Sequence, residues 1–532
     1  MKINMKNLRQ FLWIFAVVSI LNVSCRKDDP DPSNNNNDKE EPSLLVSQYL
    51  VYDGMALYYL WNEQMLGREP TEADTDARRY FESLLYRPTD VWSWITDDIN
   101  ALMRNFAGGE SARAFGFSPL HVTFTNQQNQ VVRQVAFVRY VYPGTPATEV
   151  GLRRGDAISE INGSPVNSTN VGLLFAESSL TSITLTVEDQ YFQNPRQVTI
   201  TPRAFAANPV LHSRVDSIGD RVIGYLFYTA FRGGTAASNF NEALFQVFAN
   251  FKQSGVTDLV LDLRYNPGGE VSTAIYLASM IAPRAAVVNQ EIFTTMNYNR
   301  LQNEYFDLRG WERASRLGRF NDDLLQDPLL ANINPDGNLR VFIIATRWSA
   351  SASELLTFGL RPFMGDNNVV HIGENTSGKY TVSWTVHAFD NFFVGTGANR
   401  IARAQRVHNP DDLTSAQREE LRNWAMQPIV GTYTDRDGRD FVAAGTLIPN
   451  VAVPYSIDNW VPIGDERDFL FATAISLITG QPHTAVTRSA SGHHFINDQL
   501  FSPQEQQLRR AVNVDNIEID PEMLRKMLRS LR

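Results

Sequence analysis

The region from residue 204 to residue 480 alternates short apolar runs with helical patterns, and this alternation limits the possible folds more than any other feature. Val222–Phe227 and Leu259–Leu263 predict buried strands, while Ala236–Phe251 and Val271–Ile281 predict the helices that follow them. Strands that alternate with helices usually pair in parallel, because each helix carries the chain back across the sheet. The region is therefore expected to be an α/β core.

Two other patterns precede this core. Residues 43–110 space their large apolar side chains by three or four positions, which is typical of helices, and Thr71–Asp74 predicts a helix start. Residues 111–203 contain β-branched runs separated by turn residues, as in a β-rich domain. Residues 481–532 form a C-terminal extension in which a helix is expected to begin near Asp520–Pro521. The fold class is therefore multidomain α/β.

Residues 1–24 have the layout of a secretory signal peptide. Lys2, Lys6 and Arg9 precede the apolar run Phe11–Val23, which is shorter than the roughly 20 residues that a membrane span needs. This layout resembles a bacterial lipoprotein signal, and the resemblance implies that Cys25 carries the lipid. Arg26–Asp29 resembles the short charged tag of surface-exported lipoproteins in Bacteroidetes-type bacteria. A buried helix with an incidental cysteine is the alternative.

Residues 25–42 are expected to be a flexible tether, because their polar and Asn-rich stretch from 30 to 42 has no apolar side chain to bury. A lipid on Cys25 would hold the protein at the membrane of a bacterial cell envelope, facing the periplasm or the cell surface. The lipid anchor is thus the expected membrane contact.

Charge and composition exclude several classes of function. The formal charge of −10 argues against a nucleic-acid partner, because such proteins need a cationic surface to bind phosphates. A single cysteine excludes an intrachain disulfide framework and a multi-cysteine zinc site. The eight histidines include no His-Glu-x-x-His pattern, so a helical zinc-protease site is not expected.

Three strand-to-turn segments in the core hold residues suited to catalysis. The first is Asp262–Gly269, whose Pro-Gly-Gly turn exposes backbone N–H groups just before a helix, as an oxyanion site requires. It lacks the Gly-Lys-Ser/Thr ending of a phosphate loop. The second is Thr346–Glu354, where small residues surround a serine at a helix N-terminus. Serines that only cap this helix are an equal alternative for this segment by itself.

The third segment is Gly373–Lys379, in which one of only seven lysines lies in a Gly-bounded turn. Burial of this lysine would lower its pKa from the ordinary value of about 10.4, so that its neutral amine can accept a serine proton. Serine–lysine pairs perform nucleophilic hydrolysis without histidine. A surface lysine in a glycine turn is the alternative.

The β-rich region contains Tyr142–Ala147, Val150–Ile158 and Ile161–Val166, which resemble a PDZ domain of the bacterial protease type. PDZ domains bind an extended peptide at a sheet edge and hold its terminal carboxylate with backbone N–H groups. The carboxylate-binding loop is expected just before the first strand. It would comprise Phe115, Gly116, Phe117 and Ser118, and an ordinary turn with two buried Phe side chains is the alternative.

The three core segments, in this order behind a PDZ-like region, resemble the carboxyl-terminal processing peptidases, also called tail-specific proteases, over roughly residues 50–480. The resemblance implies a crotonase-like or ClpP-like core, no metal or other cofactor, and cleavage of peptides or unfolded proteins near their C-termini. By position, Ser351 matches the nucleophile and Lys379 matches the general base. The implied oxyanion donors are the backbone N–H groups of Ala352, Gly268 and Gly269.

The sequence departs from that family at one position near the lysine. Many members carry a glutamine four residues after the lysine, where this chain has Ser383, so Ser383 is the possible lysine-orienting residue. The expected function is a serine endopeptidase whose PDZ-like domain binds substrate C-termini. The alternative is a catalytically inactive peptide-binding lipoprotein of the same fold. An esterase or β-lactamase is disfavoured, because the mature chain has neither Gly-x-Ser-x-Gly nor Ser-x-x-Lys.

Overall fold

The computed structural model describes residues 43–531, apart from 107–112, 127, 176–178, 235–238, 312–316, 321–325, 395–400, 458–459, 484–493 and 497–518. The expected signal peptide, Cys25 and the tether lie outside the described residues. Within the described part of the chain, no helix is both long enough and apolar enough to cross a membrane.

The N-terminal region is mostly helical, as expected, and its helices pack into the main hydrophobic core. The predicted helix start at Thr71–Asp74 is wrong. The Asp74 carboxylate instead accepts hydrogen bonds from the N–H and hydroxyl of Thr71 in a local turn, and the helix begins at Ala77 with Asp76 as its N-cap. The helices of this region are η1 Val46–Tyr52, α1 Asp53–Tyr58, η2 Asn62–Gln64, α2 Ala77–Leu84 and α3 Ile99–Phe106.

This region is not a separate body. Its strand β1 (Trp94–Thr96) pairs antiparallel with β22 (Ala425–Gln427), which belongs to the region 204–480. Asn299 Nδ2 also donates hydrogen bonds to the backbone oxygens of Leu57 and Tyr59. The helical region is thus built into the core by main-chain pairing as well as by side-chain packing.

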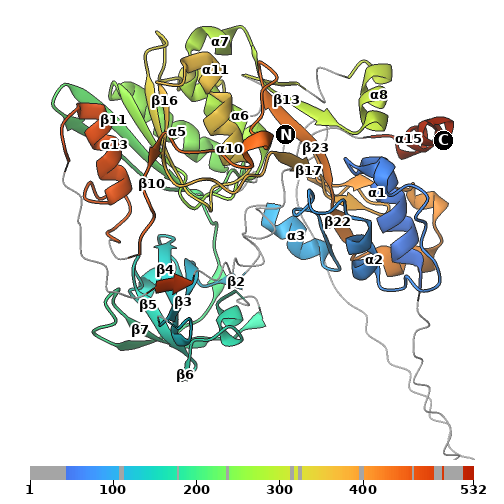
Figure 1. Ribbon diagram of the computed structural model, residues 1–532, viewed down its shortest axis with the longest axis horizontal. Helices are drawn as coiled ribbons and strands as arrows, with labels where there is room; N and C mark the ends of the chain where they lie inside the picture. Colours follow the sequence, from blue (N-terminus) through green and yellow to red (C-terminus); the bar gives the residue numbers. More distant parts are fainter. Residues whose placement is uncertain are drawn as a thin grey trace, which may run out of the picture. The chain divides into compact units, whose positions relative to one another are not determined.

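Residues 113–204 form the β-rich domain around a hydrophobic cluster of its own (Figure 1). The predicted Ile161–Val166 hairpin is present, and its turn residues Asn162 and Gly163 both have positive φ, as a tight hairpin turn requires. The elements are β2 Arg113–Ala114, β3 Phe117–Thr125, β4 Val131–Val141, α4 Pro146–Glu149, β5 Ala157–Ile161, β6 Ser164–Pro165, η3 Asn170–Phe175, β7 Ile183–Glu188, β8 Arg196–Ile200 and β9 Arg203–Ala204.

The core is a six-stranded sheet in the order β10-β11-β12-β15-β16-β24. All its neighbouring pairs are parallel except β10 and β11, which confirms the expected α/β pattern. Its strands are β10 Val210–Ile218, β11 Arg221–Tyr228, β12 Asp258–Asp262, β15 Arg340–Ala345, β16 Val369–Gly373 and β24 Val451–Ala452.

The two faces of this sheet are covered by different parts of the chain. Leu259 and Leu261 of β12 pack into the cluster that contains α5 (Phe240–Gln253), α6 (Val271–Ile281) and α10 (Ala352–Gly359). Val260, which alternates with them, belongs to a second cluster that contains α13 (Phe469–Thr479) and apolar side chains of β3 and β4. In this cluster the ring of Tyr140 of β4 lies 5.7 Å from that of Phe227 of β11. The β-rich domain therefore contacts the second face of the core sheet directly.

Two smaller four-stranded sheets complete the core, in the orders β14-β13-β23-β17 and β1-β22-β18-β21. Their remaining strands are β13 Ile292–Tyr298, β14 Leu317–Arg319, β17 Thr381–Ser383, β18 Val386–His387, β21 Gln405–Arg406 and β23 Ile429–Asp435, and β19 Phe393–Val394 pairs with β20 Ile401–Ala402. The other helices are α7 Arg284–Val288, α8 Arg300–Arg309, η5 Pro328–Leu330, α11 Arg361–Met364, η7 Pro410–Asp412, α12 Ser415–Leu421 and η8 Val442–Ala444.

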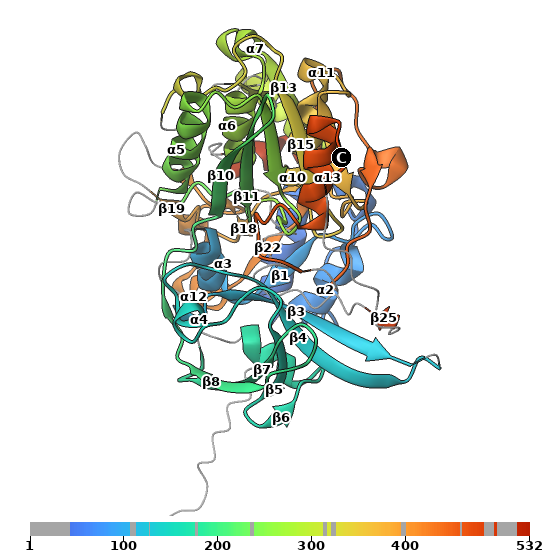
Figure 2. The same cartoon turned by 90° about the vertical axis from the view of Figure 1, so that its left-hand side faces the viewer.

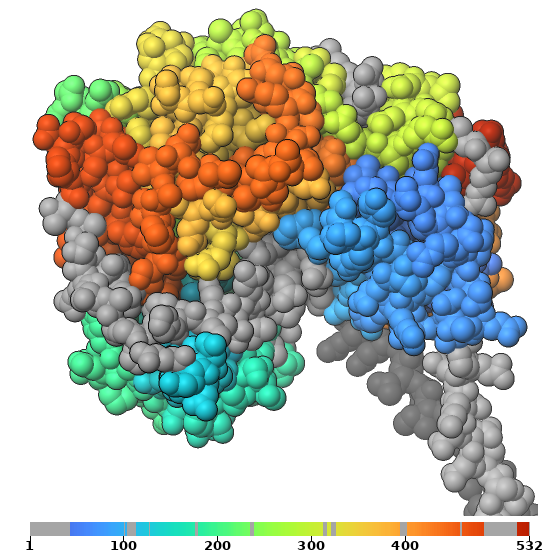
Figure 3. All heavy atoms as spheres, viewed as in Figure 1, coloured from blue at the N-terminus to red at the C-terminus, as the bar shows by residue number. Residues whose placement is uncertain are grey.

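The C-terminal extension returns to the body of the molecule. Helix α15 (Pro521–Leu531) begins where the sequence predicts, and Leu524 is fully buried beside α1 and α8. In Figure 3 the dark red surface of α15 adjoins the yellow-green surface around α8. The strand β25 (His494–Ile496) pairs with β3 of the β-rich domain.

Candidate active site

Ser351 lies in the turn between β15 and α10, at the N-cap position of the helix. Its φ of 58° and ψ of −112° are unusual for a residue with a side chain, because the left half of the Ramachandran plot holds nearly all such residues. Strained backbone of this kind concentrates at functional sites. The side chain is fully buried.

The neighbouring serines have structural hydrogen bonds. Ser349 Oγ donates to the backbone oxygen of Leu263 at 2.7 Å, and Ser353 Oγ donates to that of Asn266 at 2.9 Å. Both bonds join the Ser-rich turn to the Pro-Gly-Gly turn. Ser351 Oγ, by contrast, forms no hydrogen bond to another segment among the described residues and stands at the capping-box position of α10 with Glu354. A purely structural role therefore fits Ser349 and Ser353 better than it fits Ser351.

Lys379 follows a tightly packed glycine turn and is fully buried. Gly378 has a φ of +82°, and a Cβ on it would lie 1.9 Å from the backbone oxygen of Gly445, so that only glycine fits. Lys379 Nζ lies 5.7 Å from the centre of the Trp92 ring. Trp92 comes from the N-terminal region, which thus contributes a wall of the site.

The Glu354 carboxylate joins the two candidate catalytic segments. Oε2 accepts the N–H of Ser351 at 2.6 Å and the N–H of Lys379 at 2.9 Å, and Oε1 accepts the N–H of Gly378 at 2.7 Å and the hydroxyl of Thr376. Burial raises the pKa of Glu354, and these four donors oppose that rise. A single buried carboxylate therefore holds both turns in place.

Tyr433 of β23 makes a second bridge, to the backbone carbonyls of the same two residues. Its hydroxyl oxygen lies 3.1 Å from the backbone oxygen of Ser351 and 2.8 Å from that of Lys379. Burial raises the pKa of Tyr433 well above its usual value, so it stays a neutral donor. The backbones of Ser351 and Lys379 are thus tied through both their N–H groups and their carbonyls.

The Pro-Gly-Gly turn packs directly against the Ser351 turn. A Cβ on Gly268, whose φ is +100°, would lie 2.8 Å from Ser351 Cβ and 2.9 Å from the nitrogen of Ala352. The structure therefore brings Gly268, Ser351 and Ala352 together. The N–H of Gly268 already donates to Asn266 Oδ1 at 2.9 Å, so this amide is engaged within its own turn.

Ser383 lies on β17, and its hydroxyl donates to Gln427 Oε1 at 3.4 Å. Gln427 Nε2 in turn donates to Thr385 Oγ1 at 2.8 Å, and both Ser383 and Gln427 are fully buried. A glutamine side chain is therefore present beside the position where the family carries one, but it comes from strand β22.

The expected carboxylate-binding loop begins strand β3. Gly116 has a φ of +90°, and a Cβ on it would lie 2.3 Å from Thr145 Cβ, so the loop needs glycine at this position. Phe115 and Phe117 are buried in or near the domain core, as the alternative interpretation also expects. Ser118 Oγ accepts a hydrogen bond from Arg139 Nη2 at 2.7 Å, which places a buried guanidinium next to the loop.

Arg154 connects the β-rich domain to the candidate oxyanion turn. Its Nη1 donates to the Tyr265 hydroxyl and to the backbone oxygen of Arg139, both at 2.7 Å, and its Nε donates to the backbone oxygen of Val461. Tyr265 immediately precedes Asn266 and the Pro-Gly-Gly turn. A side chain of the β-rich domain therefore contacts the segment that carries Gly268 and Gly269.

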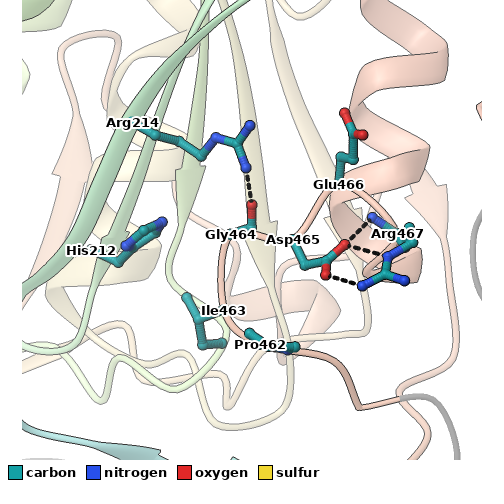
Figure 4. Close-up of a pocket in the computed structure, with 8 residues that line it drawn as sticks. All are labelled: His212, Arg214, Pro462, Ile463, Gly464, Asp465, Glu466 and Arg467. Atoms are coloured by element: carbon teal, nitrogen blue, oxygen red, sulfur yellow. Dashed lines mark hydrogen bonds and ion pairs between the residues drawn. The ribbon is translucent and has the colours of Figure 1, made fainter.

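A pocket of about 460 Å³ lies elsewhere, between β10 and the segment before α13 (Figure 4). Figure 4 shows Arg214 directed to the backbone oxygen of Gly464, a contact of 2.7 Å, and Arg467 paired with Asp465. No candidate catalytic residue lines this pocket. Arg467 pairs with Asp465 and Arg214 pairs with Asp216, which lies outside the lining, so we assign this pocket no catalytic role.

Sequence patterns did not assign Glu354, Tyr433, Gln427, Trp92 or Arg154 to the site. Glu354 stands inside the Ser-rich motif, three residues after Ser351, and this capping-box spacing was the available signal. The other four reach the site through contacts between segments that are far apart in the sequence. In the part of the chain that is described, no group of three or more acidic, His or Cys side chains could hold a metal ion.

Comparison with known proteins agrees with this architecture. The model of peptidase family S41 matches residues 222–450, the S41 N-terminal domain model matches residues 48–94, and a PDZ domain model matches residues 137–175. The S41 match includes Gly268, Ser351 and Lys379.

A carboxyl-terminal-processing protease of Picosynechococcus sp. is 26% identical over 354 residues, which are 66% of this chain and 68% of that protein. The protein of the same name from Synechocystis sp. is 27% identical over 241 residues, 44% of this chain and 47% of its own length. A crystal structure from Bacteroides fragilis, described as an S41 protease, shares the fold with a TM-score of 0.57 at 20% identity, covering 81% of this chain and 97% of that one. The chain is therefore a serine peptidase of family S41 with an N-terminal S41 domain and a PDZ domain.

Proposed function

We propose that this peptidase cleaves peptides and unfolded proteins near their C-termini, with Ser351 as nucleophile and Lys379 as general base. The observation that carries the proposal is the double bridge between these residues, through Glu354 Oε2 and the Tyr433 hydroxyl. It keeps two turns that are far apart in sequence in one fixed relation. The relatives named carboxyl-terminal-processing protease support the class of reaction.

The burial of Lys379 favours its neutral amine, because a charged ammonium is costly to remove from water. The amine accepts the proton of Ser351 Oγ as this oxygen attacks the carbonyl carbon of the scissile peptide bond. The resulting lysine ammonium then gives its proton to the leaving amine, and the C–N bond breaks to leave an acyl-enzyme. Lys379 next deprotonates a water molecule, which releases the acyl group and restores the Ser351 hydroxyl.

The developing oxyanion needs backbone donors, and Ala352 and Gly269 are the proposed ones. Ala352 is the first residue of α10, so the helix dipole also favours negative charge there. The N–H of Gly268 donates to Asn266, so Gly268 is not a proposed donor. Its role is that it has no side chain, which lets the Ser351 turn pack against it.

The PDZ domain is proposed to bind the C-terminal tail of the substrate, with its carboxylate at the loop formed by Phe115, Gly116, Phe117 and Ser118. Arg139 lies beside this loop and adds a positive charge to the backbone donors. We also propose that Cys25 is lipidated and anchors the peptidase in the bacterial cell envelope.

The test is cleavage of casein, an unstructured protein, by residues 43–532, with fragments mapped by mass spectrometry. The proposal predicts fragments from the wild type and none from Ser351→Ala. Ser353→Ala is the matched control, because it removes a serine hydroxyl from the same turn and is expected to keep cleavage. Cleavage by Ser351→Ala would refute the proposal. If the folded wild type binds the substrate and cuts nothing, the inactive peptide-binding alternative replaces it.

A further inference from the structure

Strand β3 of the PDZ domain has a neighbour on each side. Along its whole length it pairs with β4, from Phe117 opposite Val141 to Thr125 opposite Val131. On its other edge, residues Thr123–Thr125 pair antiparallel with β25, the segment His494–Ile496 of the C-terminal extension. Figure 2 shows β25 next to β3, and β25 is the outermost strand of this sheet.

The edge of β3 that β25 occupies is the edge at which a peptide would add. One edge of β3 is already filled by β4, so an incoming strand has only the other edge. The proposed carboxylate loop directly precedes β3, so a bound tail has to run antiparallel to β3 and end near Phe117.

The direction of β25 matches that of such a tail. His494 lies opposite Thr125 and Ile496 lies opposite Thr123, so the chain of β25 runs from the far end of β3 toward the loop. The segment therefore pairs with β3 in the polarity of a substrate C-terminus. It covers the end of β3 that is farthest from the loop.

The extension is fixed to the body of the protein on both sides of β25. Before it, Asp468 is the N-cap of α13, and its carboxylate forms a buried bidentate pair with Arg264. After it, the N–H of Asp520 donates to the Tyr305 hydroxyl at 3.0 Å, and Leu524 of α15 is buried. A strand tethered at both ends acts at a high effective concentration, so even a short pairing segment can compete with a free peptide.

We propose that β25 is an internal strand that occupies the peptide-binding edge of the PDZ domain and competes there with substrate C-termini. This inference rests on the proposed role of the PDZ domain in binding such tails. Recognition is by the main chain, because it consists of strand pairing. The extension thus sets the affinity of the peptidase for its substrates.

The test uses the full chain with Ser351→Ala, which prevents cleavage. In this background, the variant His494→Pro, Phe495→Pro, Ile496→Pro cannot form the strand, because proline lacks the N–H that a ladder needs. The matched control is His494→Thr, Phe495→Val, Ile496→Val, which changes the same side chains and keeps the backbone donors. If the triple proline variant does not fold, Phe495→Pro alone provides the same comparison.

Two readouts are measured on each protein. The first is the Kd of a fluorescein-labelled decapeptide that ends in Val-Ala-Val with a free carboxylate. The second is hydrogen–deuterium exchange of the amides in residues 117–125. We expect the proline variant to bind the peptide at least tenfold more tightly and to exchange faster at Thr123–Thr125, whereas the control resembles the parent.

Unchanged exchange in the proline variant would overturn the inference, because β25 would then not protect β3. Faster exchange in the proline variant, with the same Kd for the peptide in this variant and in the parent, would show that β25 does not compete with the peptide. Faster exchange with no peptide binding in any variant would refute the proposed peptide-binding role of the PDZ domain, while leaving the internal strand in place.

Discussion

The backbone N–H groups of Ser351 and Lys379 donate to the same atom, Oε2 of Glu354, at 2.6 and 2.9 Å. Between these two residues the chain forms α10, α11 and β16. A single carboxylate oxygen therefore sets how the two turns meet. The geometry of the proposed dyad depends on a residue that takes no part in the chemistry itself.

Glu354→Gln is expected to destabilise the protein and to slow catalysis. All four partners of the carboxylate are donors, so the NH₂ group of glutamine would face at least one N–H or O–H. We expect the free energy of unfolding to fall by about 2–3 kcal/mol and kcat to fall more than KM changes. Denaturant unfolding and peptide-cleavage kinetics measure both quantities.

Glu419→Gln is the control for this substitution, because Glu419 is an exposed helix residue paired with Arg422. It is expected to change stability by less than about 0.5 kcal/mol. Equal effects of the two substitutions would contradict the bridging role of Glu354.

Lys379→Arg is expected to be as inactive as Lys379→Ala. A guanidinium keeps its proton in proteins and cannot accept the proton of Ser351, although it preserves the positive charge. We expect a fall in kcat/KM of at least about 100-fold in both variants. Circular dichroism and thermal unfolding confirm that each variant is folded. Substantial cleavage by the Arg variant would remove the general-base role from Lys379.

Gly268→Ala is expected to abolish most activity. The added methyl group would lie 2.7 Å from the backbone oxygen of Ala350 and 2.8 Å from Ser351 Cβ, and the φ of +100° disfavours any side chain. Displacing the Ser351 turn should lower kcat by about 100-fold, as the loss of an oxyanion donor does. The measurement is steady-state kinetics on a fluorogenic peptide.

Gly310→Ala separates backbone strain from crowding in that experiment. Gly310 also has a positive φ, of +64°, but a Cβ on it would meet no atom within 4 Å. We expect a stability loss of about 1 kcal/mol and an unchanged kcat. A similar fall in kcat in both variants would show that the effect at Gly268 is not local to the site.

Acidification from pH 6.5 to pH 4 is expected to destabilise the fold through His387. Burial lowers the pKa of His387 to about 4, and its Nδ1 accepts the N–H groups of Phe389 and Asp390, which a protonated Nδ1 would repel. The unfolded chain binds this proton near pH 6.5, so the stabilisation is complete above pH 6.5 and declines below it. By pH 5 the loss is about 2 kcal/mol.

The measurement is denaturant unfolding of wild type and His387→Asn between pH 7.5 and 4.5. The Asn variant is expected to show a shallower decline, because asparagine offers an acceptor to the same N–H groups and does not titrate. Parallel curves for the two proteins would contradict the assignment of this pH dependence to His387. Burial also lowers the pKa of His371 to about 4, so His371 accounts for part of the decline in stability that remains in the Asn variant.

Local sequence patterns predicted most elements that carry the site. Helix α6 has the predicted bounds Val271–Ile281, and β12 differs from the predicted run Leu259–Leu263 by one residue at each end. These segments are largely apolar runs bounded by turn residues, and their lengths distinguish the strand from the helix. The error at Thr71–Asp74 arose because Ser, Thr and Asp make the same side-chain bonds in turns as at helix starts.

Residues that depend on distant pairing could not be found this way. Tyr433 reaches the dyad because β23 pairs with β17, and Gln427 reaches Ser383 because Ser383 pairs with Ile429, two residues after Gln427. Strand β25 is only three residues long and exists through its pairing with β3, which lies more than 350 residues earlier in the chain. Contacts between distant segments leave no periodic pattern in the local sequence.

The most direct test of the Ser351–Lys379 account is covalent labelling with a fluorophosphonate, followed by mass-spectrometric mapping of the modified residue. The account predicts one adduct, on Ser351, in wild type and in Ser353→Ala, and a large fall in its rate of formation in Lys379→Ala. An adduct on Ser349 or Ser353, or equal labelling rates in wild type and Lys379→Ala, would contradict it.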